Sequence, residues 1–357
     1  MYWCVGAEVR NSVPAFHMNF NVDRSLRFDR PYCIVPLERT RSFNAMSIKK
    51  IITHPGIFHA DDVCAIAWLR IIGISAPVER RVPSPEELAD PDIMVVDVGG
   101  QHTSKLNNFD HHQKGGAGIR WDSEVPYAAF GLVVDAFPLC NPAVEQRVHD
   151  CVVLPVDAAD NGWGTLEGSR PNLSFSACVS GFNPGPSASA AERDTAFETA
   201  VAFATMVLEN SIRNAEEFVA AKEVVMSASV CGGYTPYPTE GAVFGEKAEP
   251  HSILLLEKFV PWSEHVFSRR DESNLLYVVF PSERGGWMVQ QVPKAPGSFE
   301  GRKPLPEAWS GLRGEDFANV AGIKTHGSAT FCHPGRFVCG AETREDAIAL
   351  ARKAVAA

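Results

Sequence analysis

A strand, a helix and a second strand follow one another between residues 49 and 98, and this alternation constrains the fold more than any other feature. KKIIT (49–53) and DIMVVDV (92–98) are short apolar runs bounded by turn-forming residues, which predicts strands. Between them, DDVCAIAWLRIIGI (61–74) has apolar residues at helical spacing and begins with acids, which favour a helix N-terminus. We therefore expect an α/β fold, in which a mostly parallel sheet has helices on both faces.

Apolar patterns farther along the chain predict more helices and then a second group of strands. The helices are expected at 125–137, 143–160 and 190–228. Pro155 should be tolerated or bend the helix that contains it. The strands are expected at 252–258, 275–281 and 287–293, and a closing helix at 343–357. The last third of the chain is thus predicted to form a smaller α/β domain.

The chain divides into three parts at about residues 45 and 230. Residues 1–45 have no regular pattern, and we expect a poorly ordered or non-native extension there. One interpretation is an Arg-bearing organelle-targeting leader, but its acidic residues argue against that, because such leaders avoid acids. The other interpretation is that translation begins at Met46. Residues 46–230 should form the first domain, including the long helix, and residues 231–357 the second. The chain lacks a secretory signal, which favours the cytoplasm.

Composition excludes several classes of protein. No apolar run approaches the roughly 18 residues that a membrane-spanning helix needs. The nine cysteines are scattered and never spaced as CxxC, so a reducing compartment is expected. The net charge of −10 argues against binding of long duplex nucleic acid. Residues 51–260 carry 13 basic and 28 acidic side chains, and residues 261–357 carry 12 and 11. The first region is therefore expected to need cations, and the second to receive an anionic substrate.

Histidines and acids recur directly after the predicted strands of the first domain. They are His54, His59 and Asp61, then Asp97, then Asp110, His111 and His112 in FDHHQ. Asp157 and Asp160 in VDAADNG are three residues apart, which puts both on one face if that segment is helical. Ligands of open α/β sheets bind at the carboxyl ends of strands, where these side chains should meet. Each one alone is more often a cap or a satisfied polar group, and Asp62 most simply complements a helix N-terminus. Their recurrence in one domain favours a shared site.

The mixture of imidazole and carboxylate indicates a metal site. These ligands suit Mn, Fe or Zn more than Ca, and the scarcity of thiolates argues against structural zinc. The candidates are numerous enough for two ions about 3.5 to 4 Å apart, which can activate a bridging hydroxide and stabilise an in-line displacement at phosphorus. We expect such a site to be stabilised by metal, because its carboxylates repel one another.

With these residues assembled, the chain resembles the DHH phosphoesterase superfamily and, more narrowly, the melanocyte-proliferating-gene (Myg) exonuclease family. The resemblance runs from about residue 51 to the C-terminus, and it rests on THPGIFHADD, VVDVGG, FDHHQ, VPYAAFGLV, VDAADNG, RKPLPEAWSGLR and FCHPGRFVCGAETREDAIALA. It implies that residues 46–230 form a DHH catalytic domain and residues 231–357 a substrate-binding domain. The activity that it implies is Mn- or Mg-dependent phosphodiester hydrolysis, as a 3′-to-5′ exonuclease on RNA.

The resemblance also implies roles for individual residues. The implied metal ligands are His54, His59, Asp61, Asp97, His111, and Asp157 or Asp160, with Asp157 slightly preferred. Asp110, His111 and His112 form the catalytic DHH group, in which His112 either binds metal or faces the leaving group. His59 stands where the superfamily usually has Asp, which favours Mn or another transition metal. The implied substrate contacts are His326, His333, Gly335 and Arg336, in a Gly-rich segment.

The leading hypothesis is therefore an enzyme with two Mn²⁺ or Mg²⁺ ions that shortens RNA or short oligonucleotides. A small-molecule phosphatase of the same fold, acting on pyrophosphate or a nucleotide, is the enzymatic alternative. A non-catalytic protein that binds metal or RNA is the other alternative. Trp287 and Phe337 are candidates to stack on a terminal base, although such residues more often belong to the core.

Overall fold

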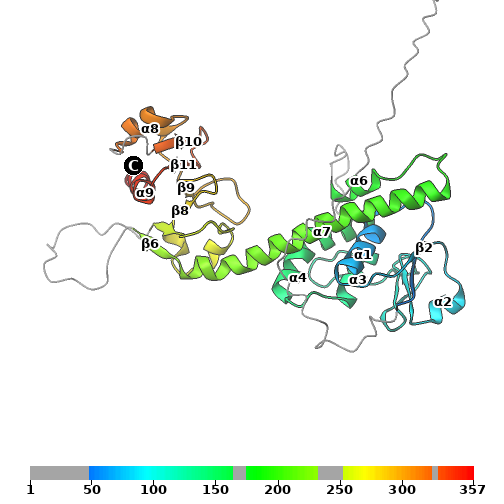
Figure 1. Ribbon diagram of the computed structural model, residues 1–357. Coiled ribbons are helices and arrows are strands. Elements are labelled where there is room, and N and C mark those ends of the chain that lie inside the picture. Colours follow the sequence, from blue (N-terminus) through cyan, green and yellow to red (C-terminus); the bar gives the residue numbers. More distant parts are fainter. Residues whose placement is uncertain (1–47, 164–173, 232–251, 324–328) are drawn as a thin grey trace, which may run out of the picture. The chain divides into compact units, whose positions relative to one another are not determined.

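The computed structural model describes residues 48–163, 174–231, 252–323 and 329–357 (Figure 1). The predicted extension at 1–45, its boundary at Met46, and His326 lie outside these residues. One sheet has five strands and the other six, and helices pack on both, so the predicted α/β class is confirmed. None of the helices described is long and apolar enough to cross a membrane.

The first sheet is mostly parallel, as expected. Its strand order is β2-β1-β3-β5-β4. The strands are β1 (Lys50–Thr53), β2 (Val78–Arg80), β3 (Ile93–Val96), β4 (His102–Thr103) and β5 (Asn108–Phe109). All neighbouring pairs are parallel except β4 with β5, which is antiparallel. Because β1, β3 and β5 are adjacent and parallel, the residues that follow them meet at one edge of the sheet.

The two faces of this sheet are covered unequally. One face packs on α1 (Ala60–Ile71), which contacts α3 (Ala129–Ala136) and α7 (Ala190–Ser227) in a large apolar cluster. On the other face, Leu88 of the short helix α2 (Pro85–Ala89) packs against a small cluster. In α1, ten residues from Ala60 to Leu69 are buried. The acids in its first turn are therefore buried together with its apolar residues.

The bend predicted near Pro155 is a change of helix type. α4 (Pro142–Val148) runs into a π-helical turn (His149–Val153), and α5 (Leu154–Asp160) follows. Proline has no N–H to donate, so an α-helical hydrogen bond is lost there, and the wider π turn accommodates the ring. Pro155 thus lies in the first turn of α5, which ends at Asp160. A further short helix, α6 (Phe175–Ser180), precedes α7.

The second sheet has the order β10-β11-β9-β8-β7-β6 and is antiparallel except between β7 and β8. Its strands are β6 (Ser229–Cys231), β7 (Ile253–Leu255), β8 (Tyr277–Pro281), β9 (Trp287–Gln291), β10 (Ala329–Cys332) and β11 (Val338–Ala341). Side chains of β8 alternate between two apolar clusters, as a pleated strand buried on both faces requires. One cluster includes α8 (Gly314–Ala321) and α9 (Arg344–Ala356), and the other includes Ala221 and Val225 of α7.

We expect Trp68→Ala to destabilise the fold by about 3–5 kcal/mol, since it removes a fully buried side chain from α1. The Trp68 indole also stands edge-on to Phe130 and donates a hydrogen bond to the Phe137 carbonyl. The matched control is Trp121→Ala, because that side chain is 94% exposed, and its effect should stay within about 0.5 kcal/mol. Urea unfolding of both variants measures the difference, and equal effects would contradict the packing described.

Candidate metal centre

The centre of the site is Asp97, which directly follows the middle strand β3. Its backbone is left-handed, with φ 56°, a conformation that residues other than glycine adopt rarely and mostly where the surroundings enforce it. The Asp97 amide donates to the Phe109 carbonyl of β5, which fixes the turn against the neighbouring strand. The Asp97 carboxylate is thereby placed between the residues that follow β1 and β5.

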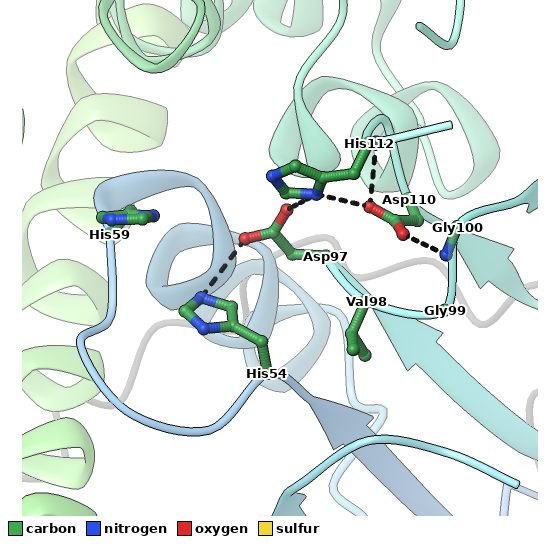
Figure 2. Close-up of a pocket in the computed structure, with 8 residues that line it drawn as sticks. All are labelled: His54, His59, Asp97, Val98, Gly99, Gly100, Asp110 and His112. Carbon is green, nitrogen blue, oxygen red and sulfur yellow. Dashed lines mark hydrogen bonds and ion pairs between the residues drawn. The ribbon is translucent and has the colours of Figure 1, made fainter. Parts of the chain in front are cut away.

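Histidines from both neighbouring strands approach this carboxylate. Figure 2 shows the rings of His54, after β1, and His112, after β5, pointing toward Asp97 from opposite sides. Asp97 Oδ2 lies 3.4 Å from His54 Nε2, and Asp97 Oδ1 lies 3.3 Å from His111 Nε2 and 3.4 Å from His112 Nδ1. A cavity of about 360 Å³ opens here, lined by His54, His59, Asp97, Val98, Gly99, Gly100, Asp110 and His112.

Two helices bring further carboxylates to the same place. Asp61 and Asp62, in the first turn of α1, are both fully buried. Asp62 Oδ2 lies 3.2 Å from His54 Nε2. At the end of α5, Asp160 Oδ2 lies 3.2 Å from His111 Nε2. Side chains separated by about one hundred residues in the sequence therefore surround one small volume.

Four overlapping groups of these side chains have ligand atoms within 4.8 Å of one another. The groups are His54, His59 and Asp97; Asp97, His111 and His112; His59, Asp61 and Asp160; and Asp61, Asp62 and Asp97. Several of their buried polar atoms have no hydrogen-bond partner, including both Asp97 oxygens, Asp62 Oδ2 and His111 Nε2. Buried polar atoms ordinarily have partners, and this mixed set suits a divalent transition metal. The residues present therefore fit metal ions.

Burial and mutual repulsion set the pKa values in this cluster. Burial, together with the charges of Asp97 and Asp160, raises the pKa of Asp61 well above its usual range. Burial alone would lower the pKa of His54, but its ion pair with Asp62 and the nearby carboxylate of Asp97 raise it to about 9. In the same way, Asp160 and Asp97 overcome burial and raise the pKa of His111 to about 10. Without metal, protons on these histidines offset the negative charge.

Asp110 belongs to none of the four groups. Its Oδ1 accepts from the His111 amide at 2.8 Å. The same oxygen accepts from His112 Nδ1 at 2.8 Å, and Oδ2 accepts from the Gly100 amide at 2.5 Å (Figure 2). The carboxylate is therefore occupied in orienting the His112 ring and the glycine turn after β3. A hydrogen bond at Nδ1 leaves His112 Nε2 for other partners, and the His112 side chain is 59% exposed.

Asp157 also lies outside the groups, although it is fully buried. Its Oδ2 accepts from Arg120 Nη2 at 2.6 Å, and its Oδ1 accepts from the Gly131 amide at 3.0 Å. Of the two acids in VDAADNG, the structure thus brings Asp160 to the cluster and holds Asp157 one helical turn away. Sequence reasoning missed Arg120, since a lone arginine in a Gly-rich loop carries no signal. It also gave Asp62 only a capping role.

The described substrate candidates of the C-terminal part form a tight turn between β10 and β11. His333 Nδ1 accepts from the Gly335 amide at 2.9 Å, and Arg336 has a left-handed backbone with φ 56°. His333 and Gly335 are exposed, and the His333 ring packs on Phe337 at 4.3 Å. Trp287 is half-buried in β9, with the Arg344 guanidinium 5.8 Å from its ring centre.

The chain matches a known protein family over most of its length. Residues 50–355 match the MYG1 exonuclease family model, which is described as "Uncharacterised protein family (UPF0160)". The chain belongs to this family. It is 30% identical to the MYG1 exonuclease of Mus musculus, over 90% of this chain and 88% of the mouse protein. It is likewise 30% identical to the MYG1 exonuclease of Homo sapiens, over 91% and 90% of the two chains. The MYG1 protein of Schizosaccharomyces pombe is 28% identical, over 87% and 98%.

We expect the metal-free protein to lose stability as pH rises from about 6.5 toward 9 and 10. The pKa values of His54 and His111 lie above the ordinary value of about 6.5, so the folded state binds more protons than the unfolded state. Their contribution is complete below about 6.5 and is lost as pH passes the raised pKa values. Urea unfolding between pH 6 and pH 9.5 measures this loss.

The His54→Gln variant is the control, because it removes one of the two titrating histidines. Its stability should depend less steeply on pH between about 6.5 and 9 than that of the unchanged chain. A stability that rises with pH across this range would contradict the ion pairs described.

Proposed function

We propose that this protein is a metal-dependent nuclease that removes nucleotides from the 3′ end of RNA. The observation that carries the proposal is the position of Asp97, whose carboxylate is shared by three of the four overlapping ligand groups. A carboxylate shared in this way is suited to bridge two cations. The relatives named MYG1 exonuclease support a phosphodiester substrate, because they match this chain over nearly its whole length.

The proposed ligand set extends over the carboxyl edge of the first sheet and two helices. It comprises His54, His59, Asp61, Asp97, His111 and Asp160, with Asp62 beside them. Asp160 is preferred to Asp157 because Asp160 contacts His111, whereas both Asp157 oxygens are occupied. The DHH triplet after β5 and the single Asp after β3 support membership of the DHH phosphoesterase superfamily. Histidine at position 59 favours Mn²⁺ over Mg²⁺.

When bound, such ions activate water and neutralise charge on a phosphoryl group. The chain itself supplies a cavity whose walls are carboxylate and imidazole, next to the turn formed by Gly99 and Gly100. Asp110 orients the His112 ring through a hydrogen bond to Nδ1. The other ring nitrogen, Nε2, is proposed to donate a proton to the ribose oxygen that leaves. The exposure of His112 is consistent with contact to a substrate at the mouth of the cavity. His112 is therefore the proposed general acid.

The C-terminal part is proposed to receive the nucleic acid. His333 and Gly335 are exposed at the turn between β10 and β11. The half-buried Arg336 guanidinium beside them, with Nη1 3.4 Å from the Leu305 carbonyl, is the proposed phosphate contact. Arg302 is less suitable, because its guanidinium is paired with Glu272, and Lys303 Nζ is engaged by the Val355 carbonyl. The acidic first region favours short or single-stranded ends over long duplexes.

We expect Mn²⁺ to restore nuclease activity to the metal-stripped protein, and Asp97→Asn to abolish it. A 5′-labelled RNA with a 3′ tail should give a descending ladder of products. Loss of the shared carboxylate should reduce turnover by about 100-fold or more, since even outer-shell residues of metal sites cost 10- to 100-fold. Asp110→Ala should also remove the ladder, because His112 loses the acceptor that orients it.

The same reactions should be assayed for phosphate released from pyrophosphate. Phosphate without an RNA ladder would replace the proposal with a small-molecule phosphatase. No product in either assay, with several metals, would favour a protein that only binds metal or RNA. Full activity of a folded Asp97→Asn variant would exclude the metal centre as the catalytic site.

Asp160→Asn should weaken Mn²⁺ binding by about 10-fold or more without a comparable loss of fold stability, because a ligand is removed from a partly open site. Isothermal titration of the metal-free protein with Mn²⁺ measures the affinity. Asp316→Asn, the same change at an exposed position of α8, is the control. Equal Mn²⁺ affinities in the two variants would remove Asp160 from the proposed ligand set.

A further inference from the structure

A buried arginine, Arg120, contacts the helix that carries Asp160 of the metal centre. The Arg120 side chain is 4% exposed, and its guanidinium contacts Asp157, His149 and Tyr127, with Asp135 Oδ1 of α3 at 4.0 Å. Nη2 donates to Asp157 Oδ2 of α5 at 2.6 Å, and Nη1 lies 2.7 Å from His149 Nε2 of the π turn. The guanidinium also lies 4.0 Å from the centre of the Tyr127 ring, just before α3. Arg120 therefore joins the helix that carries Asp160 to the segment that leads into α3.

The far side of this ion pair is closed by Gly131 in the first turn of α3. The Gly131 amide donates to Asp157 Oδ1 at 3.0 Å. A Cβ atom at position 131 would lie 2.0 Å from Arg120 Nη2 and 2.0 Å from Asp157 Oδ2. The pair thus occupies the space where a side chain would stand, and glycine lets the helix backbone reach the carboxylate.

The same turn of α3 also holds a carboxylate of the metal centre. The Ala129 amide donates to Asp61 Oδ2 at 3.3 Å, two residues before Gly131. Asp61 and Asp160 belong to one candidate ligand group, and Asp160 lies one helical turn after Asp157. The first turn of α3 therefore positions Asp61 directly and Asp160 through the Asp157–Arg120 pair.

We propose that Arg120 is a positioning residue of the metal centre, and that its pairing with Asp157 sets α5 so that Asp160 reaches its place beside His111 and Asp61. The inference rests on the proposed metal-dependent function. A buried ion pair is seldom the most stable filling for such a space, since apolar side chains of similar volume often stabilise a protein as well or better. The directional hydrogen bonds of the Arg120–Asp157 pair do fix the position of α5, whereas an apolar contact would allow the helix to shift.

The test replaces the pair by apolar side chains in the double variant Arg120→Met/Asp157→Leu. Both charges are removed, so neither is left buried and unpaired, and the variant is expected to fold. We expect its Mn²⁺ affinity, measured by isothermal titration of metal-free protein, to fall by about 10- to 100-fold. Turnover of RNA at saturating substrate should fall, while KM for the RNA stays unchanged, because the substrate contacts are intact.

The control is Arg70→Met/Glu198→Leu, which removes another forked pair between two helices, α1 and α7, at the protein surface. That pair lies at the last turn of α1, away from the ligands, so Mn²⁺ affinity should stay within about 2-fold of the unchanged chain. A folded Arg120→Met/Asp157→Leu variant with unchanged Mn²⁺ affinity would overturn the proposal. An equal loss of Mn²⁺ affinity in the control would also overturn the proposal, since the loss would then follow from removing any contact between helices.

Gly131→Ala decides the question if the double variant fails to fold. Its methyl group would push Arg120 and Asp157 apart while both charges remain. Mn²⁺ affinity should again fall by about 10-fold or more, and unchanged affinity would overturn the proposal. Because Mn²⁺ binding is measured without substrate, the test holds even when the unchanged chain cuts no RNA. In that case the proposed function fails, and the positioning role is still decided.

Discussion

The structure depends on how buried carboxylates at one sheet edge are neutralised. Asp61, Asp62 and Asp97 are almost completely removed from solvent, and a ligand oxygen of each lies within 4.8 Å of the others. Such charges repel strongly at low dielectric and must be offset by protons or cations. Histidines that follow β1 and β5 provide this compensation in the structure, and a divalent ion bound there would provide a stronger one. The fold around the site holds together groups that would otherwise separate.

The surrounding framework fixes these groups from several directions. Asp97 is held by a left-handed backbone turn between two parallel strands, and Asp61 and Asp62 by a helix that is buried nearly all round. Asp110 is held by backbone amides and a histidine, and Asp157 by an arginine and the start of α3. Both oxygens of Asp97 are without a hydrogen-bond partner, whereas the oxygens of Asp110 and Asp157 accept from backbone amides, a histidine or an arginine. Residues of the same type therefore have different environments within one cluster.

Much of the first sheet could be predicted because its strands are short apolar runs with polar residues at their ends. β1 and β3 lie within the predicted strands, and α1 and α7 begin and end within a few residues of the prediction. The short strands β2, β4 and β5 have no such pattern, since two or three residues cannot show a period. The π turn before Pro155 was likewise beyond prediction, although the disturbance itself was expected.

The sequence by itself determined the α/β class, the family and the set of histidines and acids, because local periodicity and motif spacing are written along the chain. Only the tertiary structure decided which acid of VDAADNG faces the cluster and which meets an arginine. Helical spacing places Asp157 and Asp160 on similar faces, and the difference arises from Arg120 and Gly131, more than twenty residues away in the sequence. Contacts over such separations depend on how the helices pack, which local patterns do not encode.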